Sequence, residues 1–131
     1  MTDFATKVLP AEPDVTAPDG AGVKLLLDLE GGSMAHFELQ PDQTTTAVAH
    51  RTVEEIWYVV AGQGEMWRKQ AQREEIVSLA PGVCLTIPVG THFQFRSTGR
   101  KPLAAIVVTM PPWPGEQEAY VVDGKWQPTE S

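Results

Sequence analysis

The 131-residue sequence predicts a single all-β domain folded as a small antiparallel barrel or jelly roll. Turn signals recur about every 8–12 residues, a rhythm typical of β-sandwiches and barrels. Eleven glycines and eleven prolines supply these turns. No stretch of useful length places apolar residues at the spacing of an amphipathic helix. These observations favour an all-β chain that is long enough to enclose one core.

We expect three segments along the chain. Residues 1–22, rich in proline, form an extended arm with a short strand near 4–9. This arm either stays loose or pairs with the barrel or with another subunit. Residues 23–110 form the barrel itself. Residues 111–131 form a tail that proline keeps extended and that packs on the barrel, with an edge strand at 119–122.

The first half of the barrel contains four predicted strands. Residues 23–28 form an apolar run that a Glu-Gly-Gly turn ends, and 33–40 alternates an Ala-Phe-Leu face with a Met-His-Glu face. Residues 56–60 are β-branched or aromatic, without a breaker. Because both faces of this strand are largely apolar, we expect it to be covered on both sides. A Gly-Gln-Gly turn at 62–64 leads into the return strand, 66–70.

The second half contains four more predicted strands. Residues 74–79 follow a polar turn, and 83–87 and 103–110 are apolar runs that predict buried strands. We therefore expect Cys84 to be a buried, unreactive thiol. Residues 92–96 alternate His-Phe-Gln-Phe-Arg, so the two phenylalanines face one way and the polar residues the other.

Charge and composition exclude several classes of partner. The net charge is −7, from 10 basic and 17 acidic residues, without a basic stripe, so we expect no nucleic-acid or membrane partner. No apolar run approaches the ~20 residues of a membrane span. The first residues lack the charged and apolar regions of a secretory signal. A single cysteine excludes an intrachain disulfide and fits a reducing compartment, so we expect a cytoplasmic location.

Residues 48–62 resemble the first motif of the cupin family, H-x-H-x(3,4)-E-x(6)-G. His50, Glu55 and Gly62 match it, whereas Val48 stands at the first histidine position. The resemblance implies a single-domain cupin β-barrel, also described as a double-stranded β-helix or jelly roll. It further implies a homodimer, because small cupins commonly pair through their outer strands.

Residues 82–97 resemble the second cupin motif, G-x(5)-P-x-G-x(2)-H-x(3)-N. The two glycines and the proline match, but Phe93 occupies the histidine position, with His92 one place early, and Ser97 replaces the asparagine. If the strand is shifted by one residue, His92 and Gln94 face the cavity. In the other register Phe93 and Phe95 do, because a one-residue slip exchanges the two faces.

The resemblance also implies a metal site. Cupins typically hold one divalent metal with three imidazoles and one carboxylate, a set that suits iron, manganese, nickel, copper or zinc. His50 and Glu55 carry over, and His92 would complete a two-histidine, one-carboxylate set. Val48 cannot coordinate, so the metal is absent if His92 faces outward. His36 is either a sheet-packing residue or a compensating ligand.

Two functional classes follow. One is a metal-dependent enzyme of dioxygenase, isomerase or cyclase type, with His50 and Glu55 as catalytic residues. The other is a metal-free, non-catalytic cupin that binds a small ligand. Without a metal, Glu55 orients His50 or acts as a general acid or base, or the two form a satisfied buried hydrogen bond.

A small apolar or aromatic molecule is the expected ligand or substrate. The residues that we expect to line its pocket are Trp57, Trp67, Phe93, Phe95 and Gln94. A plain core role is the alternative for the tryptophans. In the tail, Trp113 either packs on the outside of the barrel or closes its mouth.

Overall fold

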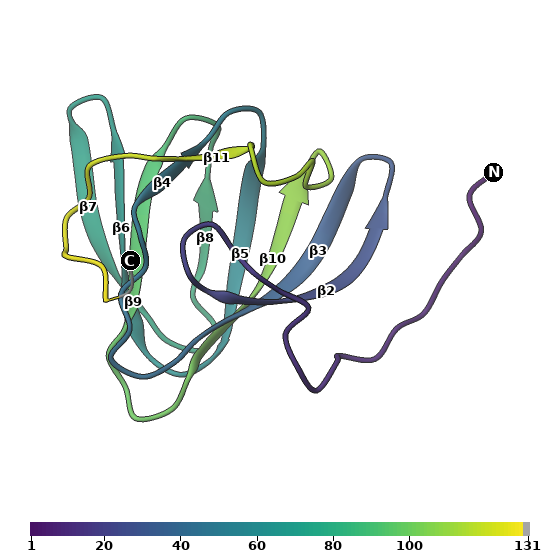
Figure 1. The fold of residues 1–131 in the computed structure, drawn as a ribbon, viewed down its shortest axis with the longest axis horizontal. Helices are drawn as coiled ribbons and strands as arrows, with labels where there is room; N and C mark the ends of the chain where they lie inside the picture. The colour runs from purple at the N-terminus through teal and green to yellow at the C-terminus, as the bar shows by residue number, and fades with distance from the viewer. Residues whose placement is uncertain (130–131) are drawn as a thin grey trace.

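The computed structural model describes residues 1–129 and contains two antiparallel sheets that face each other. Within these residues there is no helix, and therefore no helix that could span a membrane. Figure 1 shows the N-terminal arm leading away from the barrel, and the C-terminal tail running across the opposite end of the molecule. The predicted all-β jelly roll is confirmed.

The larger sheet has six strands in the order β1-β2-β3-β10-β5-β8. The central strand β10 pairs with β3 on one side and with β5 on the other. The strands are β1 (Val15–Thr16), β2 (Gly22–Leu29), β3 (Gly32–Leu39), β5 (Glu54–Ala61), β8 (Cys84–Ile87) and β10 (Leu103–Met110).

The smaller sheet has five strands in the order β11-β4-β9-β6-β7. Its register places Val48 of β4 opposite Phe93 of β9. The strands are β4 (Val48–His50), β6 (Gly64–Gln70), β7 (Arg73–Leu79), β9 (His92–Ser97) and β11 (Ala119–Val121).

The core lies between the two sheets and follows from the alternation of each strand. On β5, Trp57 and Val59 point inward and are almost fully buried. The Trp57 ring meets Phe95 of the opposite sheet edge-on, with ring centroids 5.0 Å apart. Burying such a side chain contributes about 1.5–3 kcal/mol. These contacts join the two sheets across the barrel.

The turn between β5 and β6 depends on its glycines. Gly62 has a φ of 79°, a conformation that favours glycine. A Cβ at Gly64 would collide with the carbonyl oxygen of Arg96, because β6 and β9 approach closely there. The predicted Gly-Gln-Gly turn is therefore confirmed, and the glycine that matches the motif has a physical reason to be there.

Three expectations about the outside of the barrel are wrong. The arm has no strand near 4–9, and its first strand is β1. Cys84 is exposed, because it begins β8 on the outer face of the sheet. Ile56 and Tyr58, also on the outer face, are exposed in the single chain, so β5 is covered on its inner side only.

The tail is fixed to the outer face of the smaller sheet by one buried glutamine. The Gln94 amide donates to the carbonyls of Thr45 and Trp126, at 2.7 and 2.8 Å. Its oxygen accepts bonds from the backbone N–H groups of Lys125 and Trp126. The Trp126 ring also stacks on the Arg96 guanidinium, 4.1 Å from its centroid. These contacts hold the end of the tail on the barrel.

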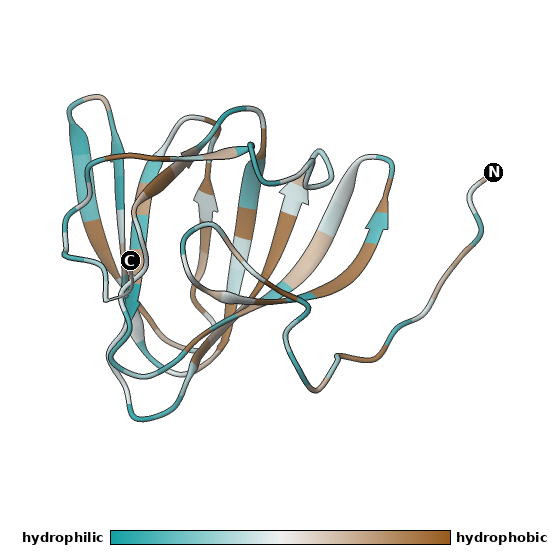
Figure 2. Cartoon of the chain, viewed as in Figure 1, coloured by the Kyte–Doolittle hydropathy of each residue, from teal (hydrophilic) through white to brown (hydrophobic). Residues whose placement is uncertain are grey.

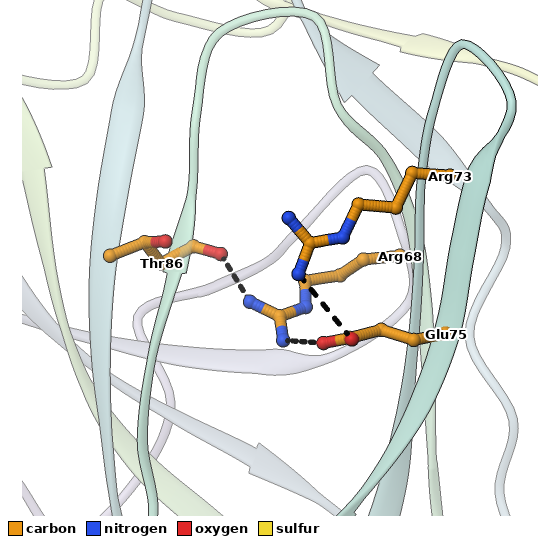
Figure 3. A network of polar contacts seen from close by, with 4 residues as sticks. All are labelled: Arg68, Arg73, Glu75 and Thr86. Carbon is orange, nitrogen blue, oxygen red and sulfur yellow. Dashed lines mark hydrogen bonds and ion pairs between the residues drawn. The ribbon is translucent and has the colours of Figure 1, made fainter.

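A polar network closes the gap between the edge strands β7 and β8, and we call the space beside it the seam pocket. Arg68 donates to the Thr86 carbonyl at 2.9 Å and to the Glu75 carboxylate at 2.6 Å (Figure 3). Arg73 lies 3.7 Å from the other Glu75 oxygen. Figure 2 shows that the adjoining end of the β6–β7 hairpin is hydrophilic, whereas β2 and β10 carry long apolar stretches.

Candidate functional site

A cavity of about 660 Å³ lies at the side of the barrel where β2 and β3 face β4 and β9. The N-terminal segment around β1 and the first part of the tail complete its wall. Most of the wall is apolar, and its aliphatic and aromatic residues include Val23, Leu25, Ala35, Phe37, Val48 and Phe93. A concave, mainly apolar space with a few polar groups is the usual form of a small-molecule site.

His50 lies at the end of β4 and lines this cavity. The residue is 4% exposed, and its Nδ1 is buried with no hydrogen-bond partner among the described residues. Its ring meets Phe93 and Trp113 edge-on, at 5.2 and 5.1 Å between centroids. Burial lowers the pKa of the imidazole to about 4, so His50 is neutral at pH 7.

Glu55 lies on the inner face of β5 and lines the same cavity. The residue is 3% exposed, and one carboxyl oxygen accepts a bond of 2.9 Å from the Trp57 indole N–H. Its pKa is raised to about 8, mainly by burial; the bond from the Trp57 indole opposes the shift and the charge of Asp19 adds to it. Glu55 is therefore mostly protonated at pH 7.

Asp19, which the sequence analysis did not identify, also lines the cavity. It lies in the turn between β1 and β2, and its carboxylate accepts a bond of 3.1 Å from the Ala21 N–H. Burial raises its pKa to about 6. The Asp19-Gly20 pair signals a turn, but nothing in the local sequence places that turn beside β5.

Glu118, a second residue that the sequence analysis missed, fixes the loop between His50 and Glu55. Its carboxylate accepts bonds from the Thr52 hydroxyl, the Thr52 N–H and the Val53 N–H, at 2.6, 2.6 and 2.8 Å. Burial opposes ionisation of Glu118, but these bonds outweigh it and lower the pKa. Glu118 thus positions the two cavity groups from the tail.

The predicted set of His50, Glu55 and His92 is not brought together. Val48 pairs with Phe93, whose ring lines the cavity, and His92 pairs with Lys69 outside it. The inward position of His92 that completed the metal set is therefore wrong. The physical reason is the register of β9, since adjacent residues of a strand point to opposite faces.

The five predicted pocket residues separate into three groups. Phe93 lines the cavity. Trp57 and Phe95 are buried in the core beside it and do not line it. Trp67 and Gln94, paired in the register of β6 and β9, point away from the core, so their placement in the pocket is wrong. The Trp67 indole donates to Glu74 at 2.7 Å, and Gln94 holds the tail.

Trp113 and His36 occupy opposite sides of the larger sheet. Trp113 lines the cavity and its backbone N–H donates to the Ser33 hydroxyl at 3.2 Å, so it lies at the mouth of the barrel. His36 lies on the outer face near Glu38, 3.8 Å from its carboxylate, while its neighbours Ala35 and Phe37 face the cavity. His36 is therefore not a compensating ligand.

The donor atoms do not fit the metal that the motifs implied. Among residues 1–129, no three His, Cys, Asp or Glu side chains are grouped so that they could hold a metal ion. The cavity retains His50 and Glu55, but the other two expected imidazole positions carry Val48 and Phe93, which face each other. A site with one imidazole and one carboxylate does not meet the needs of a first-row transition metal.

Comparison with known proteins identifies the fold family. The cupin domain model matches residues 35–109, which is more than half of the chain. No curated protein matches the sequence.

Solved structures support the same fold. The chain is similar to the capsular polysaccharide assembling protein CapF from Staphylococcus aureus, with 18% identity and a TM-score of 0.68 over 79% of this chain and 32% of CapF. The chain thus spans about a third of CapF, which has also been solved with the inhibitor 3-isopropenyl-tropolone. KdgF from Halomonas sp. has 18% identity and a TM-score of 0.64, over 75% of this chain and 85% of KdgF. The Drosophila melanogaster CENP-C cupin domain has 15% identity and a TM-score of 0.63, over 70% and 66%.

Proposed function

This chain belongs to the cupin family, and we propose that it binds a small, mainly apolar molecule inside the barrel without a metal. The observation that carries the proposal is the cavity of about 660 Å³, whose apolar wall is interrupted by His50 and Glu55. Small-molecule sites are commonly of this size and composition. The unpartnered Nδ1 of His50 and the buried carboxyl of Glu55 are polar groups that a ligand would satisfy.

Cavity filling tests this proposal. Ala35 lies on the cavity wall, so Ala35→Phe should abolish binding of neutral aromatic fragments in ligand-observed NMR. Ala5→Phe, on the exposed arm, is the matched control and should bind as the wild type does. Amide shift changes in the wild type should cluster at His50 and Trp113, a readout that needs no variant. Equal binding to the filled variant, or no fragment binding at all, would contradict the proposal.

A second candidate function is proton transfer of the isomerase type, favoured by one observation. Two buried groups with opposite proton roles line one cavity, since His50 is neutral and Glu55 is mostly protonated at pH 7. A neutral imidazole can accept a proton, although burial makes His50 a weaker base than a free imidazole, and a protonated carboxyl can donate one. Acetophenone, a carbon acid with an aromatic body, should then exchange its methyl hydrogens with deuterated water in the wild type and not in His50→Phe. Equal exchange rates would exclude this role.

We further propose that two copies pair through the outer face of the larger sheet. This face exposes Met34, Ile56, Tyr58 and Val60 in the single chain, although β5 carries the two-sided apolar pattern of a covered strand. Contiguous apolar surface of this kind is typical of protein interfaces. Light scattering should give a dimer for the wild type and a monomer for Tyr58→Glu, whereas a monomeric wild type would exclude the pairing.

A further inference from the structure

The ionisable groups of the cavity are unbalanced in charge. Asp19, Asp28, Glu55 and Glu116 line it, and in the described chain no lysine or arginine does. The fifth ionisable group is the neutral His50. Carboxyl groups in an apolar environment are normally paired with a cation or held protonated. The described wall therefore supplies no cation to these acids, of which Glu55 is held mostly protonated at pH 7.

Three cations that adjoin lining residues in sequence or through a hydrogen bond are engaged elsewhere. Lys24 forms a 2.7 Å ion pair with Glu38 on the outer face of the sheet. Lys7, on the arm, donates to the backbone carbonyl of Leu25 at 2.7 Å. Arg51 lies over the Tyr120 ring and donates to a tail carbonyl. None of these three cations lines the cavity, so the imbalance is not corrected by a neighbouring side chain.

If the proposed function is accepted, we infer that the ligand is an organic cation, an ammonium group on an apolar or aromatic body. The carboxyl groups would bind the ammonium, and the apolar wall would bind the body. Phe37, Phe93 and Trp113 give the wall three aromatic faces, a setting in which a cation is also attracted to the rings.

An independent observation points to a ligand at the same place. His50 is 4% exposed as a residue, and its Nδ1 is buried with no hydrogen-bond partner within the described residues. A buried nitrogen of this kind costs about 1–3 kcal/mol when it stays unsatisfied. An ammonium N–H donates to a neutral imidazole nitrogen, so one cationic group would satisfy both His50 and the acids.

The depth of the acids suggests how such a ligand would enter. Asp28 and Glu116 are exposed at the rim, where negative charge attracts a cation from solvent. Asp19 and Glu55 are buried, and burial raises the pKa of both in the free protein. An ammonium beside them would favour their ionised forms. The rim would thus steer the cation and the buried pair would hold it.

Three indole probes of similar size but different charge test the inference. Tryptamine carries an ammonium, tryptophol a hydroxyl and indole-3-acetate a carboxylate on similar bodies. By calorimetry at pH 7, we expect tryptamine to bind the wild type about tenfold or more tightly than tryptophol, and indole-3-acetate to bind weakest. The preference should shrink at high salt, because charge attraction is screened.

Substitutions of single acids test which residues cause the preference for tryptamine over tryptophol. Glu55→Gln and Asp19→Asn should reduce the tryptamine-to-tryptophol ratio to near one, and Asp28→Asn, at an exposed position, should reduce it partly without risk to folding. Glu75→Gln in the seam pocket is the matched control and should keep the wild-type ratio. Equal binding of tryptamine and tryptophol to the wild type would overturn the cation inference and leave the proposed function intact. Binding of none of the three would contradict both.

Discussion

The seam pocket and the larger cavity differ in how their charged groups are arranged. The seam pocket, about 220 Å³, is lined by Arg68, Lys69, Arg73 and Glu75, and its carboxylate is shared by two guanidinium groups. The larger cavity has carboxyl groups and one neutral imidazole, but no lining cation among the described residues. In the seam the Glu75 carboxylate is shared by Arg68 and Arg73, and Arg68 also bonds to Thr86, so this network joins two sheet edges. The cavity has carboxyl groups with no lining cation and a His50 Nδ1 without a partner among the described residues, and this difference is why we place ligand binding there.

The largest expected difference between the cavity and the seam pocket is how their acids affect the pH dependence of stability. The unfolded chain releases the Glu55 proton near pH 4.5, whereas the folded chain keeps it up to about pH 8. The folded chain binds more protons between these values, so stability falls as pH rises. Asp19 adds to this loss of stability up to about pH 6. His50 opposes the loss below pH 6.5, because its imidazole stays neutral in the folded chain down to about pH 4.

Between pH 6.5 and about 8 the free energy of unfolding should decrease by about 2 kcal/mol, mainly because of Glu55. Urea unfolding across this range should therefore show decreasing stability in the wild type and a much flatter profile in Glu55→Gln. Glu75→Gln should keep the wild-type slope, since Glu55 is unchanged. A wild-type profile that rises from pH 6.5 to 8 would show that Glu55 ionises normally in the fold.

A smaller effect is expected from the seam. Arg68→Met removes the bonds to the Thr86 carbonyl and to Glu75, at a partly exposed position, and should lower stability by about 1 kcal/mol. Adding Glu75→Leu should restore part of the loss, because no carboxylate then lacks its partner. Fragment binding in the cavity should be unchanged. Loss of binding in Arg68→Met with an intact fold would show that the two hollows are coupled.

The smallest expected effect is that of added metal. Mn²⁺, Ni²⁺ or Zn²⁺ should leave the thermal midpoint of the wild type unchanged, because a ligand that binds the fold would raise it. Elemental analysis of protein purified without a histidine tag should likewise find no stoichiometric metal. A stoichiometric metal that disappears in His50→Ala would favour the metal-dependent enzyme instead.

The strands were predictable because their signals are local. Residues 103–110 form β10 with the bounds that the apolar run predicts, and the turn at Gly62 and Gly64 follows from its glycines. The structure of the arm was not predictable, because the apolar residues near Phe4 resemble a strand but find no pairing partner among residues 1–129. Local pattern predicts where a strand can form, and pairing decides where it does form.

The site was predictable only in part. The cupin motifs identified His50 and Glu55, and both line the cavity. Whether His92 or Phe93 faces the cavity depends on strand register. A sequence in which apolar and polar residues alternate does not fix that register. Asp19 and Glu118 come from irregular segments before and after the barrel, and only tertiary structure brings them to the cavity and the His50 loop.

The tail does more than cover the outside of the barrel. Between β10 and β11 it supplies Trp113 to the cavity wall, and Glu118 to the loop beside His50. If a molecule binds in this cavity as proposed, its binding and the attachment of this segment should be thermodynamically linked, so that the bound molecule would protect the segment from proteases.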